Sequence, residues 1–315
     1  MVSARDRDVI QELLRHYGIP FCTRGKGANG MIGKMLYILK ADTLLLQKAI
    51  RFKPDLFLSF ASPYAAHVAW LMRKPHIVLD DTESAWLNHC LYLPFSTTPL
   101  NPASFKKDFG HKQIRFDSFM ELAYLHPRYF TPSASVRANL GIAQDQKYCI
   151  LRFVAWSANH DVGQRGISLE AKVKLVELLS SHMKVFISSE SELPDSLKPY
   201  QINIPSDKLH DALAFASLYI GEGATTASEC AMLGTPAIYI NSLSAGTLED
   251  QHQMGLIHNL RDTATLFDTI HQITTNEEMA NVFRSRRQKM LAEKIDITAF
   301  LVWFRSEEHT SELQS

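Results

Sequence analysis

The 315-residue sequence has little cysteine, no excess charge of either sign and no long apolar run. Its four cysteines are widely spaced and form no C-x-x-C pair, which predicts the reduced thiols of a cytoplasmic protein. Lys+Arg and Asp+Glu number 33 each, so the net charge favours neither nucleic acid nor an anionic membrane as a partner. No segment approaches the roughly 20 apolar residues of a membrane-spanning helix, and no secretory signal is recognisable.

Several catalytic signatures are missing as well. The sequence contains no H-E-x-x-H, no G-x-x-x-x-G-K-[ST] and no G-x-S-x-G, so a metalloprotease, a P-loop enzyme and an α/β-hydrolase have no support. The thirteen histidines are scattered, mostly on expected helices or beside prolines. We therefore expect no metal site.

The sequence does contain a regular alternation of strand-like and helical patterns. Short apolar runs typical of buried parallel strands occur at Ile19–Thr23, Pro54–Ser59, Pro75–Leu79, Tyr148–Val154, Met183–Ser188, Leu218–Ile220 and Ala237–Ile240. Segments with apolar residues at helical spacing lie between them. This alternation predicts an α/β fold with parallel sheets wrapped by helices.

Two successive alternations predict two Rossmann-like domains, which we expect over residues 1–137 and 138–304. The aromatic and proline-rich passage Glu121–Pro132 is typical of a junction between domains. Residues 1–6 run from a strand-like piece directly into a helix, so we expect an earlier βα unit to be missing. Residues 305–315 break off the preceding apolar pattern and look like translated sequencing-adapter read-through, so they carry no fold prediction.

The stretch Leu218–Asn241 is the most informative one. Gly221 and Gly223 allow a tight turn and a close backbone approach, and Ala224–Glu229 begins a helix with small side chains and hydroxyls. The unpaired N–H groups and the dipole of such a helix N-terminus suit a phosphate. The alternative is an ordinary βαβ turn whose glycines serve close packing, and the pattern alone leaves both open.

Carboxylates follow the expected strand Pro75–Leu79, at the edge where open α/β sheets bind ligands. One carboxylate of Asp80–Glu83 could act as a base or hold an acceptor hydroxyl. The alternative is that Asp80 or Asp81 caps the next helix, Ser84–Cys90. Both interpretations stay open.

A second polar group follows the expected strand Tyr148–Val154. Its candidates are Asn159, His160, Asp161 and Arg165, and the His-Asp pair could serve in acid–base chemistry. A purely structural loop is the alternative. Ser188–Glu190 ends the next strand and is expected to face the same cleft.

A set of longer motifs resembles one prokaryotic family, catalogued as domain of unknown function 354 and placed among GT-B glycosyltransferase-like proteins. The motifs are Asp81-Thr-Glu, Phe105-Lys-Lys-Asp, Glu121-Leu-Ala-Tyr-Leu-His-Pro, Leu151-Arg-Phe-Val, His160-Asp-Val-Gly, Phe186-Ile-Ser-Ser-Glu and Leu233-Gly-Thr-Pro-Ala-Ile. The resemblance covers residues 1–300. It implies a GT-B-like fold of two Rossmann-like domains facing a cleft, with an acceptor-side N-terminal domain that lacks its usual first strand and turn.

The family also resembles UDP-N-acetylglucosamine 2-epimerases and the lipid-linked muramyl-peptide N-acetylglucosaminyltransferase. In those enzymes a glycine turn and helix hold the nucleotide diphosphate, and a glutamate in that helix takes the ribose hydroxyls. Glu222 departs from the pattern, because a carboxylate beside a diphosphate repels it. Either its side chain points away, or the donor pocket is altered. The positions that the resemblance implies are Gly221, Gly223, Ala224, Thr225 and Thr226 for the diphosphate, Glu229 for the ribose and Gln251 for the donor sugar.

The resemblance implies an inverting, metal-independent GT-B glycosyltransferase that takes a UDP-sugar and serves surface polysaccharide or glycolipid synthesis. Arg152 or Arg165 would stabilise the leaving charge, and Asp81 or Glu83 would deprotonate a sugar or lipid-linked acceptor. We expect no cofactor and no nucleic-acid partner, and a cytoplasmic location with peripheral contact to the inner face of the membrane.

Two alternatives are kept. A 2-epimerase would use the same donor site, with His160, Asp161 and Glu190 around the sugar. A non-catalytic nucleotide-sugar binding protein would bind the donor without turnover.

Overall fold

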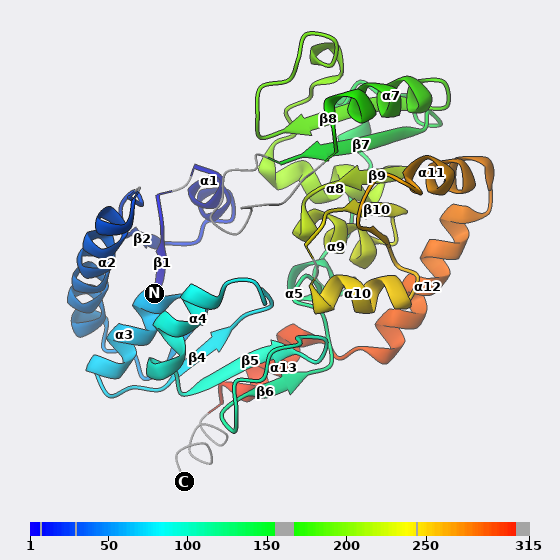
Figure 1. Ribbon diagram of the computed structural model, residues 1–315. Helices are drawn as coiled ribbons and strands as arrows, with labels where there is room; N and C mark the ends of the chain where they lie inside the picture. The colour runs from blue at the N-terminus through cyan, green and yellow to red at the C-terminus, as the bar shows by residue number, and fades with distance from the viewer. Residues whose placement is uncertain (7, 29, 155–166, 244, 307–315) are drawn as a thin grey trace. The chain divides into compact units, whose positions relative to one another are not determined.

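The structure is a computed structural model that describes residues 1–306 except 7, 29, 155–166 and 244. These residues divide into two compact units (Figure 1). One unit holds Met1–Phe116 and also takes in the described residues from Phe304 on, and the other holds Asp117–Trp303. Each unit is an α/β layer structure with parallel strands, which confirms the predicted fold class.

The first unit contains two parallel sheets. Its helices and strands are β1 (Val2–Ala4), α1 (Asp8–His16), β2 (Phe21–Thr23), α2 (Met31–Phe52), β3 (Phe57–Phe60), α3 (Pro63–Leu71), β4 (His76–Leu79), α4 (Trp86–Tyr92), η1 (Leu93–Phe95), β5 (Thr98–Pro102) and β6 (Ile114–Phe116). Strands β1 and β2 pair with each other, whereas β3, β4, β5 and β6 form a separate sheet in that order.

The long helix α2 packs along α3, and apolar side chains of both helices meet β3. Leu45, Ala49, Phe57, Val68 and Ala69 form this buried cluster. Ser62 caps the start of α3 by accepting a hydrogen bond from Ala65 N, and Pro63 occupies the first helical position. Because β4 and β5 pair in parallel, their carboxyl ends lie at one edge of the sheet and their amino ends at the other.

The second unit contains one five-stranded parallel sheet. Its elements are α5 (Leu122–Leu125), α6 (Val136–Asn139), β7 (Tyr148–Phe153), α7 (Leu169–Ser180), β8 (Lys184–Ser189), η2 (Lys198–Tyr200), η3 (Ser206–Lys208), α8 (Leu209–Ala214), β9 (Leu218–Gly221), α9 (Ala224–Leu233), β10 (Ala237–Ile240), α10 (Gly246–Gln253), β11 (His258–Leu260), α11 (Leu266–Thr275), α12 (Met279–Glu293) and α13 (Ile297–Phe304).

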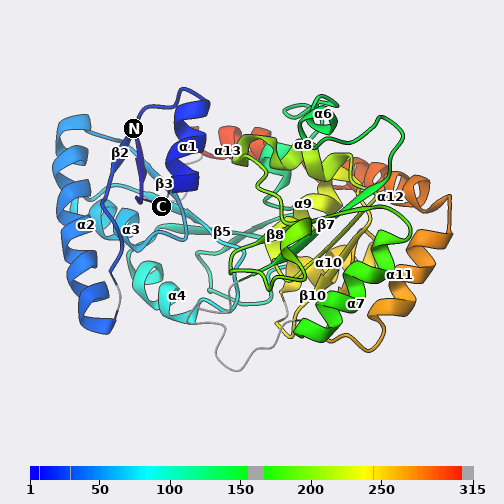
Figure 2. The ribbon, with the colours of Figure 1, turned by 90° about the horizontal axis from the view of Figure 1, so that it is seen from above.

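The strand order in this sheet is β11-β10-β9-β7-β8. Helices α7 and α11 cover one face of it, while α8 and α9 lie on the other (Figures 1 and 2). The chain passes from β7 outward to β8 and then crosses back to β9 on the opposite side of β7. Ligands in such sheets bind at the carboxyl ends of the strands where the order reverses, which here is between β7 and β9.

The segment 117–137 belongs to the second unit because several polar contacts tie it there. Lys294 Nζ lies 2.6 Å from Asp117 Oδ1, and Ser133 N donates to Asp211 Oδ1 at 2.8 Å. The compact units therefore divide at residue 116, whereas the sequence predicted a division at residue 137. The boundary depends on contacts between residues more than seventy positions apart, which no local sequence pattern predicts. Within the described part of the chain, no helix is long and apolar enough to cross a membrane.

Candidate functional site

The turn between β9 and α9 leaves the helix N-terminus open. Gly223 precedes the ten-residue helix with φ −91° and ψ 120°, and no side chain caps the first turn. Ala224 and Thr225 are exposed, whereas the side chain of Thr226 is buried. The first N–H groups of a helix have no intrahelical acceptor, and they lie at the positive end of its dipole. This arrangement suits a phosphate group.

The two glycines of this turn have different roles. A Cβ at Gly221 would clash with the Tyr219 hydroxyl and would lie 2.6 Å from Tyr219 Cζ. A Cβ at Gly223 would meet only Val154 Cγ1 at 3.6 Å and the Arg152 side chain at 3.8 Å, which are ordinary contact distances. Gly221 therefore serves packing, whereas a Cβ at Gly223 would fit without a clash against Val154 and Arg152.

Arg152 on β7 lies beside the Gly223 turn. Its guanidinium donates to Ser188 Oγ at 3.2 Å and to Glu190 Oε1 at 2.9 Å, at the carboxyl ends of β7 and β8. The structure thus brings Arg152, Glu190 and the Gly223 turn together, all three named from the sequence. A cation beside a helix N-terminus strengthens the attraction for an anion.

Glu222 points away from the helix N-terminus. Its carboxylate is buried, with a relative exposure of 1% for the residue, and accepts hydrogen bonds from Ile167 N at 2.7 Å and Val154 N at 3.0 Å. Lys172 Nζ lies 3.8 Å from the same carboxylate. Of the two outcomes left open by the sequence, the carboxylate turned away from the turn is the one observed.

Glu229 lies in the second turn of α9 and is held by two side chains that sequence reasoning missed. Its Oε1 accepts from Tyr124 Oη at 3.0 Å and lies 3.0 Å from His210 Nε2. The rings of Tyr124 and His210 lie 5.4 Å apart. Tyr124 is 105 positions away in the chain, so no local signal could have indicated this pairing.

Gln251, predicted to contact the donor sugar, lies in the interior on α10. The residue is fully buried, and its Nε2 donates to Ser228 Oγ at 2.5 Å. This hydrogen bond links α10 to α9 in the interior. The assignment of Gln251 to the donor sugar stays a prediction. The predicted residues Asn159, His160, Asp161 and Arg165 lie outside the described residues.

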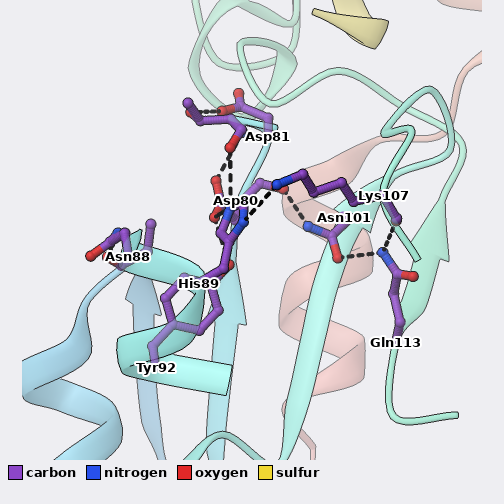
Figure 3. A network of polar contacts seen from close by, with 10 residues as sticks. Asp80, Asp81, Asn88, His89, Tyr92, Asn101, Lys107 and Gln113 are labelled. Atoms are coloured by element: carbon purple, nitrogen blue, oxygen red, sulfur yellow. Dashed lines mark hydrogen bonds and ion pairs between the residues drawn. The ribbon is translucent and has the colours of Figure 1, made fainter. Parts of the chain in front are cut away.

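Asp80, at the end of β4 in the first unit, is the centre of a buried network (Figure 3). Its Oδ2 accepts from Tyr92 Oη at 2.6 Å and lies 3.1 Å from His89 Nε2. Its Oδ1 accepts from Thr82 N, and its carbonyl oxygen accepts from Asn101 Nδ2. Asp80 is therefore a structural residue that joins the end of β4 to α4 and β5.

Neither Asp80 nor Asp81 caps α4, contrary to the alternative interpretation of the sequence. The helix begins at Trp86 after Ala85, and no side chain accepts from its first turn. The helix starts two residues later than the expected Ser84. Asp80 and Asp81 therefore lie too far from its first turn to cap it.

Asp81 lies just beyond the network (Figure 3) and has a different electrostatic environment. Burial raises the pKa of Asp81 to about 6, and the charges of Asp80 and Glu83 add to this effect. Thr82 Oγ1 donates to Asp81 Oδ1 at 3.1 Å, which opposes it. Glu83 Oε1 accepts from Lys106 N at 3.2 Å. A carboxylate with a pKa near neutrality is suited to proton transfer.

The described residues contain no group of histidine, cysteine, aspartate and glutamate side chains that could hold a metal ion. The proton-transfer candidate Asp81 and the anion-binding turn of α9 lie in separate units.

The comparisons with known proteins agree with the two-domain fold. The family described as "Protein of unknown function (DUF354)" matches residues 1–302. Among curated protein sequences, none matches this chain.

Solved structures with similar folds include both glycosyltransferases and epimerases. A glycosyltransferase from Streptomyces sp. SF2575, complexed with thymidine diphosphate, is 14% identical with a TM-score of 0.59, covering 97% of this chain and 91% of that one. A UDP-GlcNAc 2-epimerase from Neisseria meningitidis, bound to UDP-GlcNAc, is 12% identical with a TM-score of 0.55, covering 91% and 90%. The corresponding epimerase from Methanocaldococcus jannaschii is 12% identical with a TM-score of 0.59, covering 84% and 82%. At these identities the likeness shows the GT-B fold.

Proposed function

Because the chain belongs to the DUF354 family, whose description assigns no activity, we propose its function from the geometry of its two units. It is a nucleotide-sugar-dependent glycosyltransferase of the inverting GT-B type. The acceptor is a sugar or a lipid-linked sugar of surface polysaccharide or glycolipid synthesis, and the protein works in the cytoplasm with peripheral contact to the membrane.

The observation that carries this proposal is the open N-terminus of α9. The backbone N–H groups of Ala224, Thr225 and Thr226 have no acceptor within the helix, Arg152 lies beside them, and the Glu222 carboxylate is turned away. A nucleoside diphosphate develops negative charge as it leaves the anomeric carbon. Fixed N–H groups and a guanidinium stabilise that charge without a metal ion.

In this proposal Glu229 binds the ribose of the donor. Two hydrogen bonds to Oε1, from Tyr124 and His210, hold the carboxylate in one orientation. The second oxygen is the one proposed to accept from a ribose hydroxyl. The similar folds that were solved with thymidine diphosphate and with UDP-GlcNAc support a nucleotide-sugar as the donor.

Asp81 is the proposed base. The acceptor hydroxyl attacks the anomeric carbon, its proton passes to the Asp81 carboxylate, and the bond to the diphosphate oxygen breaks. A pKa of about 6 leaves most of Asp81 ionised at neutral pH and gives it a greater proton affinity than an ordinary aspartate.

Calorimetric titration with UDP, thymidine diphosphate and their sugars tests the donor site. Wild type should bind at least one of them, and Glu229→Ala should bind the nucleoside diphosphate more weakly than wild type does. Failure of every nucleotide to bind a folded protein would overturn the proposal.

A 2-epimerase is the second candidate, because similar folds include several UDP-GlcNAc 2-epimerases. Incubation of the bound nucleotide-sugar without any acceptor separates the two activities. Conversion of the donor sugar to its epimer under these conditions would identify an epimerase. A transferase leaves the donor unconverted until an acceptor is added.

A further inference from the structure

The first unit has a pocket of about 820 Å³ at the amino ends of β4, β5 and β6. Thr98, the first residue of β5, and Ile114, the first residue of β6, form part of its wall. The Asp80 network lies at the opposite, carboxyl edge of the same sheet. The pocket is therefore separate from the proposed catalytic residues, and its volume lies in the range of small-ligand sites.

The ionisable residues that line this pocket are all basic. Arg73, Lys74, His111 and Lys112 line it, and no lining residue is acidic, although acidic and basic residues balance over the whole sequence. Among the described residues, no hydrogen bond or ion pair involves the side chains of Arg73, His111 or Lys112. Lys74 pairs with Asp55 at 3.3 Å, but that aspartate side chain is 97% exposed and weakly held. Clustered cations repel one another, and a bound anion removes that repulsion.

An aromatic wall adjoins the cations. Trp70 packs edge-on against Phe95, with ring centroids 5.6 Å apart, and both residues line the pocket. Trp70 remains 59% exposed, and the neighbouring Leu71 is 55% exposed. A large exposed indole beside a cationic pocket offers an apolar surface next to a charged one, which fits a ligand with both parts.

Arg73 has an unusual backbone conformation. It follows α3 with φ 54°, in the left-handed region that glycine usually occupies after a helix. Arg73 N donates to Trp70 O at 3.0 Å and Lys74 N donates to Ala69 O at 2.9 Å, so the turn is closed by backbone hydrogen bonds. Trp70 and Arg73 are thus placed on one rigid helix end.

We propose that this pocket binds a phosphate-bearing ligand whose apolar portion rests on Trp70 and Phe95. Arg73 and Lys112 contact the phosphate, with Lys74 and His111 around it. The phosphate belongs either to a free phosphorylated compound or to the headgroup of an anionic lipid, since both present the same chemistry. The proposal concerns a different edge and a different unit from the donor site, and it does not depend on the transferase activity.

Binding of two probes tests the pocket, with tryptophan fluorescence and calorimetry as readouts. Hexyl phosphate represents the free compound, and phosphatidylcholine vesicles with or without phosphatidylglycerol represent the lipid. Wild type should bind at least one probe at low ionic strength, and the binding should weaken as salt is added. A response to hexyl phosphate alone assigns a free ligand, and a response only to vesicles with phosphatidylglycerol assigns the lipid headgroup.

The matched variants are Arg73→Asn with Lys112→Gln and, as the control, Lys53→Asn with Lys48→Gln. Asparagine tolerates the left-handed backbone of Arg73, and Lys53 has the same conformation with φ 53° outside the pocket. Both double variants remove two positive charges from the first unit. The pocket variant should bind the probe about 10-fold more weakly or worse, while the control binds like wild type. Equal weakening by the two variants, or no binding of either probe to wild type, would overturn the proposal.

Discussion

Substitution of the two turn glycines by alanine should separate packing from ligand binding. In Gly221→Ala the new Cβ would clash with the Tyr219 hydroxyl and would lie 2.6 Å from Cζ and 3.1 Å from Arg152 O. Tyr219 is fully buried on the central strand β9, so its ring has no space into which it can move. In Gly223→Ala the nearest atom lies at 3.6 Å, and φ of −91° is normal for alanine.

The expected magnitudes differ accordingly. Overpacking of a filled core costs about 1–3 kcal/mol, and the loss of glycine flexibility in the unfolded chain returns about 0.4–1 kcal/mol. Gly221→Ala should therefore be destabilised by about 1–2 kcal/mol, which lowers Tm by about 2–8 °C for a unit of this size. Gly223→Ala has no clash to offset that gain, so its Tm should lie about 1–4 °C above that of wild type.

Nucleotide affinity should show the opposite order. The methyl group in Gly223→Ala lies in contact with Arg152 and directly before the N–H groups of α9 that we assign to the diphosphate, so UDP affinity should fall about 10-fold or more. Calorimetric Kd and thermal unfolding of both variants measure the two effects. Equal loss of Tm in both variants would refute the packing argument, and unchanged UDP affinity in Gly223→Ala would refute the placement of the phosphates.

Three further predictions concern buried ionisable groups. Glu222→Ala leaves the N–H groups of Val154 and Ile167 without an acceptor and should lower stability by about 2–5 kcal/mol in urea unfolding; a wild-type midpoint would contradict this. Asp81→Asn should abolish transfer. It should also raise the free energy of unfolding at pH 7 by about 1–3 kcal/mol, because the folded-state pKa of Asp81, about 6, exceeds the ordinary value of 3.8. This difference in stability between variant and wild type should vanish below pH 4. In wild type the transfer kcat/KM should fall below pH 6 as Asp81 is protonated, and a flat profile would exclude it as the base. Burial lowers the pKa of His76 from 6.5 to about 4, so the free energy of unfolding should fall as pH drops between these values. In wild type, protonation of Asp81 in the folded state opposes this loss. Unfolding of Asp81→Asn should therefore show a steeper loss of stability than wild type.

Much of the fold follows from local patterns in the sequence. The apolar runs Tyr148–Val154 and Ala237–Ile240 predicted buried parallel strands, and β7 and β10 lie there. Gly234 predicted the end of the preceding helix, and it adopts φ 76° at that position. These features depend on neighbours within a few residues, which is why the sequence shows them.

The roles of the site residues depended on contacts that are distant in the chain. The acidic side chain of Glu222 suggested repulsion of a phosphate, but its direction follows from the backbone N–H groups of Val154 and Ile167, 68 and 55 positions away. Burial of Gln251 follows from the packing of α10 on α9, which no pattern in α10 reveals.

Residue type and local spacing were enough to predict the α/β class, the glycine turn before α9 and the carboxylates at the end of β4. Which of these carboxylates is held in a hydrogen-bond network, and which has a raised pKa, depends on tertiary contacts. Asp80 accepts from Tyr92 and lies beside His89 in the interior, while Asp81, one residue later, keeps a raised pKa near neutrality. Adjacent residues of a strand end face opposite directions, and the partners that each one meets come from distant parts of the chain.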